Sequence, residues 1–165
     1  MAIGERGSVT LRAAGPEDLM FYFTLRNEAG VRANSRNTNP IDLETHRRWF
    51  TGKLQDPNTR LMVIILSGEA IGQVRIDVRE DRSEISIAII PECRGKGYGA
   101  WAIREACRMV FSRVPKLACI FAYIRAVNSA SRRSFATAGF FECGPVSYRG
   151  AAGWIEAVLT KSAIR

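Results

Sequence analysis

Hydrophobic and polar positions repeat with two different periods along the chain, and each change of period marks an expected element. Alternation with a period of two, or a short apolar run, predicts strands over residues 8–12, 60–66, 70–78, 83–90, 117–124, 141–147 and 154–160. Apolar positions three and four residues apart predict helices over 15–28, 42–55, 101–111 and 128–138. The order β-α-α-β-β-β-α-β-α-β-β favours one α+β domain, residues 1–165, on a mixed sheet.

Two strands form the expected centre of that sheet. The strand over 117–124 is almost continuously apolar, so we expect it to be buried on both faces or nearly so. It should run parallel to the strand over 83–90, because a helix intervenes between them. The polar stretch 31–40 predicts a loop, and Asp42 with Thr45, or an apolar contact from Ile41, should begin the next helix.

The segment that joins the strand over 83–90 to the following helix carries the most informative chemistry. Pro91 ends the strand, glycines occupy positions 95, 97 and 99, and Arg94 and Lys96 lie beside them. Glycine lets backbone N–H groups approach a ligand, and a helix N-terminus favours negative charge. The segment therefore predicts an anion-binding loop. A P-loop is excluded because no hydroxyl follows the lysine, and a dinucleotide fingerprint because the third glycine comes one residue early.

The spacing Arg-x-x-Gly-x-Gly, carried by Arg94, Gly97 and Gly99, resembles the acetyl-CoA signature of the GCN5-related N-acetyltransferase (GNAT) family. For this hexapeptide alone, an ordinary glycine-rich turn is the alternative.

A second stretch strengthens the resemblance. Asn128, Ser131 and the Gly139–Phe140 pair match the family's other cofactor motif, and the same residues predict a capped helix. Phe135 departs from the motif, because many members carry there the tyrosine thought to protonate the departing thiolate.

The resemblance implies a GNAT-like domain whose mixed central β-sheet is splayed between two parallel strands, with flanking helices. Acetyl-CoA would be the co-substrate, with its pantetheine arm in the splay, and no metal is implied. The implied cofactor ligands are Ile89 and Ile90 through their backbones, Arg94, Gly95, Lys96, Gly97, Tyr98, Gly99, Asn128 and Ser131.

The resemblance also implies a catalytic base. Members often place the carboxylate that deprotonates the amine, directly or through water, where this chain has Glu84. A solvated acid at a strand end is the alternative for Glu84. Since Phe135 has no proton to donate, Tyr123, Tyr98 or a water must protonate the thiolate.

The N-terminal half shows a looser resemblance, to acetyltransferases that modify the 4-amino group of nucleotide-linked sugars. It implies an acceptor pocket with arginines on the pyrophosphate and an aromatic ring on the base or sugar. The candidate residues are Arg26, Asn27, Arg32, Ser35, His46 and Trp49. For His46, the single histidine, a partly buried helix position is the alternative.

Two other functions remain open at this point. Ribosomal-protein N-terminal acetyltransferases share the same CoA-binding half, and a basic body suits work near the ribosome. A non-catalytic CoA-binding module would keep the anion-binding loop without a usable base. Phe135 favours such a module slightly, and Glu84 argues against it.

Charge adds support for an anionic cofactor. The formal net charge is +8, yet residues 1–93 hold 12 Lys and Arg against 13 Asp and Glu, whereas residues 94–165 hold 12 against 3. The excess lies in the half that carries both cofactor motifs, where a positive field would attract the phosphates of CoA. A solvated basic face and a nucleic-acid surface are alternatives; no nucleic-acid-binding motif favours the latter.

The remaining features point to an ordinary globular protein. Hydrophobic residues make up 47% of the chain and charged residues 24%. No apolar run has the length of a membrane span, and residues 1–6 lack the layout of a signal peptide, so we expect a cytoplasmic protein. The cysteines Cys93, Cys107, Cys119 and Cys143 predict buried reduced thiols. A homodimer remains open.

Overall fold

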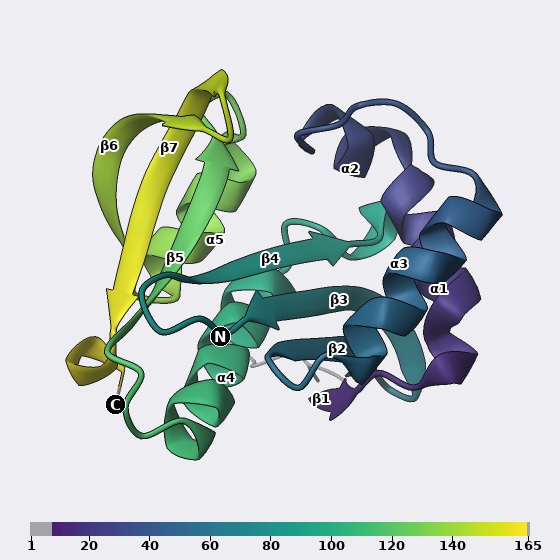
Figure 1. The fold of residues 1–165 in the computed structure, drawn as a ribbon, viewed down its shortest axis with the longest axis horizontal. Coiled ribbons are helices and arrows are strands. Elements are labelled where there is room, and N and C mark those ends of the chain that lie inside the picture. Colours follow the sequence, from purple (N-terminus) through teal and green to yellow (C-terminus); the bar gives the residue numbers. More distant parts are fainter. Residues whose placement is uncertain (1–7, 165) are drawn as a thin grey trace, which may run out of the picture.

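The computed structural model describes residues 8–164, so the expectation for residues 1–6 lies outside it. A seven-stranded sheet has the order β1-β2-β3-β4-β5-β7-β6 (Figure 1). Its strands are β1 (Val9–Ala13), β2 (Thr59–Leu66), β3 (Glu69–Asp77), β4 (Ser83–Ile89), β5 (Cys119–Arg125), β6 (Phe141–Tyr148) and β7 (Ala151–Thr160). Among the described strands only β4 and β5 pair in parallel, which confirms the expected mixed sheet.

Helices cover both faces of this sheet. They are α1 (Leu19–Asn27), α2 (Ala29–Ala33), α3 (Leu43–Gln55), α4 (Tyr98–Arg113) and α5 (Ser129–Thr137). On β2, Ile64 packs in the cluster that contains α4, whereas Val63 packs with Tyr22 of α1 and Phe50 of α3. Because successive side chains of a strand point to opposite faces, α1 and α3 lie on the face opposite α4.

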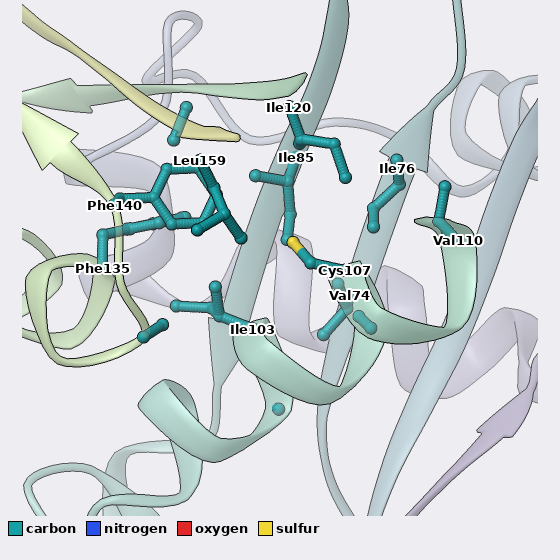
Figure 2. Packing of buried hydrophobic residues seen from close by; sticks show 14 of the residues in the cluster. Val74, Ile76, Ile85, Ile103, Cys107, Val110, Ile120, Phe135, Phe140 and Leu159 are labelled. Atoms are coloured by element: carbon teal, nitrogen blue, oxygen red, sulfur yellow. The ribbon is translucent and has the colours of Figure 1, made fainter. Parts of the chain in front are cut away.

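The larger core lies between the sheet and α4. Ile103, Cys107 and Val110 of α4 meet Val74 and other aliphatic side chains of β3 and β4 (Figure 2). Ile103 and Cys107 are fully buried. This packing anchors α4 against β3 and β4. The segment that joins β4 to α4, residues 90–97, is the expected anion-binding loop and is also named the cofactor loop.

The parallel pair separates soon after it forms. β4 and β5 pair only over the rungs Ser83–Ile120, Glu84–Phe121 and Ile85–Ala122. Beyond them the two strands run apart, β4 to Ile89 and β5 to Arg125 (Figure 1). The expected splay is therefore confirmed.

Two expectations about local structure are wrong. The stretch 31–40 is not entirely loop, because α2 extends to Ala33 and is capped by the Glu28 side chain, which accepts from two amide groups of its first turn. The strand over 117–124 is buried on one face only: β5 buries Ile120, Ala122 and Ile124, while its alternate residues are half-buried. The other face of β5 carries polar and aromatic side chains beside the splay.

Other local expectations are met in part. Asp42 begins α3 by accepting from the amide of Thr45 at 2.9 Å, as expected. All four cysteines are free thiols, and Cys107 is buried, but Cys143 is exposed, contrary to expectation. No helix within residues 8–164 combines the length and the apolar character needed to cross a membrane.

Candidate active site

The open edge of β4 presents backbone groups to the splay. The amide of Ile90 donates to the carbonyl of Ile71 on β3 at 2.9 Å. Since backbone groups alternate along a strand, the amides of Ile87 and Ile89 point the other way, into the gap. The carbonyl of Ile89 accepts from Arg94 Nε at 2.9 Å. Of the two expected backbone ligands, Ile89 therefore faces the gap, while the amide of Ile90 is used within the sheet.

The cofactor loop ends β4 and begins α4. Gly95 and Gly97 have φ values of 73° and 87°, a region that favours glycine, and Gly97 is the N-cap of α4. No side chain caps that end of the helix, so its first amide groups are directed to the surface beside the exposed Lys96. This geometry suits a bound phosphate group.

The second motif forms a helix cap. Asn128 Oδ1 accepts from the amide of Ser131 at 3.1 Å and so begins α5. Phe135 is 4% exposed and meets Phe140 edge to face with centroids 5.0 Å apart. Its ring belongs to the core, so this position of the motif supplies packing.

Glu84 lies one rung before the splay opens. Its Oε2 accepts from the hydroxyl of Tyr148 at 2.8 Å and lies 3.7 Å from Arg149. Burial, and then the bond to Glu84, raise the pKa of Tyr148 to about 12, so this hydroxyl remains a donor at neutral pH. The carboxylate is thus held by a partner that the sequence did not reveal.

Tyr123 is the first residue of β5 beyond the last parallel rung. Its ring stacks on Tyr148 at 4.1 Å, and its hydroxyl donates to Glu156 at 3.1 Å and contacts Arg82. Burial raises the pKa of Tyr123. Tyr98 instead packs partly buried against the main core at the start of α4.

A pocket of about 240 Å³ lies on the face that carries α1 and α3. Its lining residues come from α1, the loop before α3, α3 and β3: Arg26, Ile41, Thr45, His46, Trp49 and Arg75. Three of them are expected acceptor residues. Arg75 was not among the expected residues. It pairs with Ser86 of β4, and Ser86 and Glu84 point to the same face because they lie two residues apart, so Arg75 is on the face that carries Glu84.

The pocket is basic. Among its described lining residues none is acidic, and Arg26 Nη1 and His46 Nε2 are buried without a hydrogen-bond partner. His46 is 3% exposed; burial and then the charge of Arg26 lower its pKa, which keeps the imidazole neutral. The Arg75 guanidinium lies 5.7 Å from the Trp49 ring and 3.0 Å from Asp77.

The other three expected acceptor residues hold the loop between α2 and α3. Asn27 exchanges two hydrogen bonds with the backbone of Ile41, both at 2.9 Å. Arg32 donates to the carbonyls of Asn27 and Thr38, and Ser35 Oγ to that of Val31. They lie outside the lining of the pocket and shape the loop beside it.

Comparison with known proteins decides the family. A model of the GNAT acetyltransferase domain matches residues 8–141. The chain belongs to the GNAT family. Membership confirms the expected enzyme class, an acetyltransferase, with acetyl-CoA as its co-substrate.

Relatives of the chain differ in their named acceptors. A Bacillus subtilis (strain 168) protein, YwnH, with the provisional name phosphinothricin acetyltransferase, is 29% identical over 147 residues, 82% of this chain and 86% of its own. The spermidine N-acetyltransferase of Vibrio cholerae, solved with CoA and spermine, superposes with a TM-score of 0.81 at 20% identity, covering 94% of this chain and 97% of that one. A ribosomal-protein-alanine N-acetyltransferase from Brucella melitensis gives 0.75 at 24% identity, with 92% and 99% covered.

The structural likenesses establish the fold, and the match to the domain model establishes the family. The nucleotide-sugar resemblance of the N-terminal half has no counterpart among these relatives. Within residues 8–164, no group of three or more His, Cys, Asp or Glu is arranged to hold a metal ion.

Proposed function

We propose that this enzyme transfers the acetyl group of acetyl-CoA directly to a primary amine of a small anionic acceptor, in a ternary complex. The observation that carries the proposal is the open β4 edge, where the Ile89 amide faces the splay just before the anion-binding loop begins. The loop amides of residues 95–99 and the ammonium of Lys96 bind the pyrophosphate, and the α5 segment begun by Asn128 and Ser131 borders the cofactor.

The chemistry follows from that placement. The neutral amine attacks the thioester carbonyl, a C–N bond forms, and the carbonyl oxygen becomes an oxyanion that accepts from the Ile89 amide. Glu84 takes the proton from the amine through a chain of several water molecules. The C–S bond then breaks, and the CoA thiolate takes a proton from water or from Tyr123, which lies at the opening of the splay.

The acceptor we favour is a nucleotide-linked 4-amino-sugar. Arg26 and Arg75 offer charge to a pyrophosphate, and Trp49 offers a ring face to the base or sugar. Among the described lining residues a polyamine would meet two guanidinium groups, of which Arg75 is paired with Asp77, and no carboxylate, which disfavours it electrostatically. A cytoplasmic location stays a prediction from the sequence.

A turnover assay that reads free CoA thiol tests the proposal. The panel holds a UDP-4-amino-sugar, a dTDP-amino-sugar, phosphinothricin, spermidine, kanamycin and ribosomal-protein N-terminal peptides. We expect turnover with an anionic acceptor, and Arg26→Gln should raise its KM about tenfold, whereas Arg47→Gln, at an exposed position on the same helix layer, should not. Turnover with peptides alone would assign protein acetylation, and CoA binding without turnover would assign a binding module.

A further inference from the structure

One ion pair joins the cofactor loop to the acceptor side of the molecule. Arg94 Nη2 lies 2.6 Å from Glu28 Oε2, across 66 residues of sequence. Glu28 lies at the junction of α1 and α2, and Arg94 opens the anion-binding loop. The family motif would assign the Arg94 side chain to the cofactor, yet its guanidinium pairs with the Glu28 carboxylate on the acceptor side.

Glu28 serves two elements with one carboxylate. Oε1 accepts from the amide of Gly30 and Oε2 from that of Val31, both at 2.9 Å, which caps α2. The Arg94 bond, and then the Gly30 amide, lower the pKa of Glu28 to about 2, so the group is ionised at every pH at which the enzyme would work. The cap of α2 and the pair with Arg94 therefore depend on each other.

Arg94 also contacts the end of β4. Its Nε donates to the carbonyl of Ile89, the residue whose amide faces the splay. Its Nη1 lies against α2 so closely that a Cβ added to Gly30 would sit 2.7 Å away. A planar guanidinium can make these contacts at once, whereas a lysine ammonium cannot.

The connection continues into the loop between α2 and α3, residues 34–42, which borders the pocket and is named the acceptor loop. Arg32 of α2 ties the α1 terminus to Thr38, and Arg26 Nη2 donates to the carbonyl of Asn37 at 2.8 Å. From the far side of the splay, Arg125 of β5 donates to the carbonyl of Ser35 at 3.0 Å. The loop that borders the pocket is thus fastened to both strands of the splay, to β4 through Glu28 and Arg94.

We infer that Glu28 and Arg94 are positioning residues, which hold the acceptor loop in register with the thioester-binding edge of β4. Arg94 then acts on the acceptor side through Glu28, and the phosphates of CoA are bound by loop amides and Lys96. The expected change in the KM of the acceptor rests on the proposed function. The expected change in the order of the loop rests on the contacts of Glu28 and Arg94 alone.

The test compares Glu28→Gln, Arg94→Gln and the double variant with Glu105→Gln. The control removes an exposed ion pair, Glu105–Arg108, within one turn of α4. We expect the Kd for CoA, measured by calorimetry, to change less than about twofold in every variant, while the KM of the acceptor rises about tenfold in each single variant and no further in the double one. Arg94→Lys should restore little, because the fork is lost.

Amide hydrogen exchange gives a readout that needs no acceptor. In Arg94→Gln, which leaves the Glu28 cap chemically intact, exchange over residues 29–38 should quicken about tenfold, with the control unchanged. A large rise in the CoA Kd of Arg94→Gln, with exchange over 29–38 unaltered, would show that Arg94 is a phosphate ligand and overturn the inference. If no acceptor in the panel turns over, the proposed function fails, and exchange together with the CoA Kd still decides the role of the pair.

Discussion

Replacing Glu84 by Gln tests the proposed chemistry most directly. Glutamine has nearly the shape of glutamate, and its carbonyl oxygen can still accept from the hydroxyl of Tyr148, which holds the carboxylate at 2.8 Å. The substitution removes the negative charge and the basic oxygen and leaves the strand in place. A change in rate would therefore report on proton transfer more than on folding.

The size of the effect follows from the position of Glu84. A strand rises about 3.3 Å per residue, so Ile87 lies about 10 Å and Ile89 about 16 Å further along β4. Over that distance Glu84 can accept the proton of the amine only through a chain of several water molecules. General-base catalysis contributes about 10²- to 10⁴-fold, so kcat should fall at least about 100-fold, or about 2.7 kcal/mol in the barrier.

The assay is thiol release at saturating acetyl-CoA, with the CoA Kd measured separately. Glu105→Gln is the matched control, because Glu105 also has a paired carboxylate, with Arg108, but lies on α4 away from Glu84 and Tyr123. We expect the control to retain most of the activity. A Glu84→Gln enzyme with wild-type kcat across the pH range, or an equal loss in both variants, would refute the assignment of Glu84 as the base.

Three further predictions concern the loop, the pocket and the core. Gly97→Val places a β-branched residue at φ 87° in the cofactor loop and should raise the Kd for CoA at least about tenfold by calorimetry, whereas Gly52→Ala, with no atom near its added Cβ, should leave it unchanged; equal affinity would contradict the loop assignment. The pKa of His46 is depressed in the folded protein, so as the pH falls the unfolded protein binds a proton at His46 first, and the stability of the folded protein should fall below about pH 6.5. The melting temperature of His46→Phe should not show this fall; the same pH dependence of the melting temperature in the wild type and in His46→Phe would contradict the prediction. Ile103→Ala should lower the free energy of unfolding in urea by about 2–5 kcal/mol, since Ile103 is fully buried between α4 and the sheet, and a change below about 1 kcal/mol would contradict that packing.

Two motif positions show how a family pattern can name a residue without its role. Phe135 stands where the family motif implies a tyrosine, and its ring packs on Phe140 within the core. Arg94 completes the anion-binding signature, yet its guanidinium is paired with Glu28. In both cases the direction of the side chain depends on its packing and pairing partners, which the motif does not record.

Features that depend on a few consecutive residues could be predicted from the sequence. The periods of two and of three to four residues located the strands and the principal helices. The glycines at 95 and 97 marked a loop that requires positive φ, and Asp42 marked the start of α3. The short helix α2 was missed, since its cap is a glutamate, which is not among the residues that usually begin a helix.

The sequence by itself determined the α+β class, the strand that leads into an anion-binding loop, and the acetyltransferase family, because each is written in local period and spacing. Only the tertiary structure decided which groups meet. Arg75 of β3 joined Arg26 and His46 in one pocket, Tyr148 was brought to Glu84, and Glu28 was brought to Arg94. These contacts link residues 20 to 66 positions apart, and their geometry is set by how the helices and strands pack, which no local pattern records.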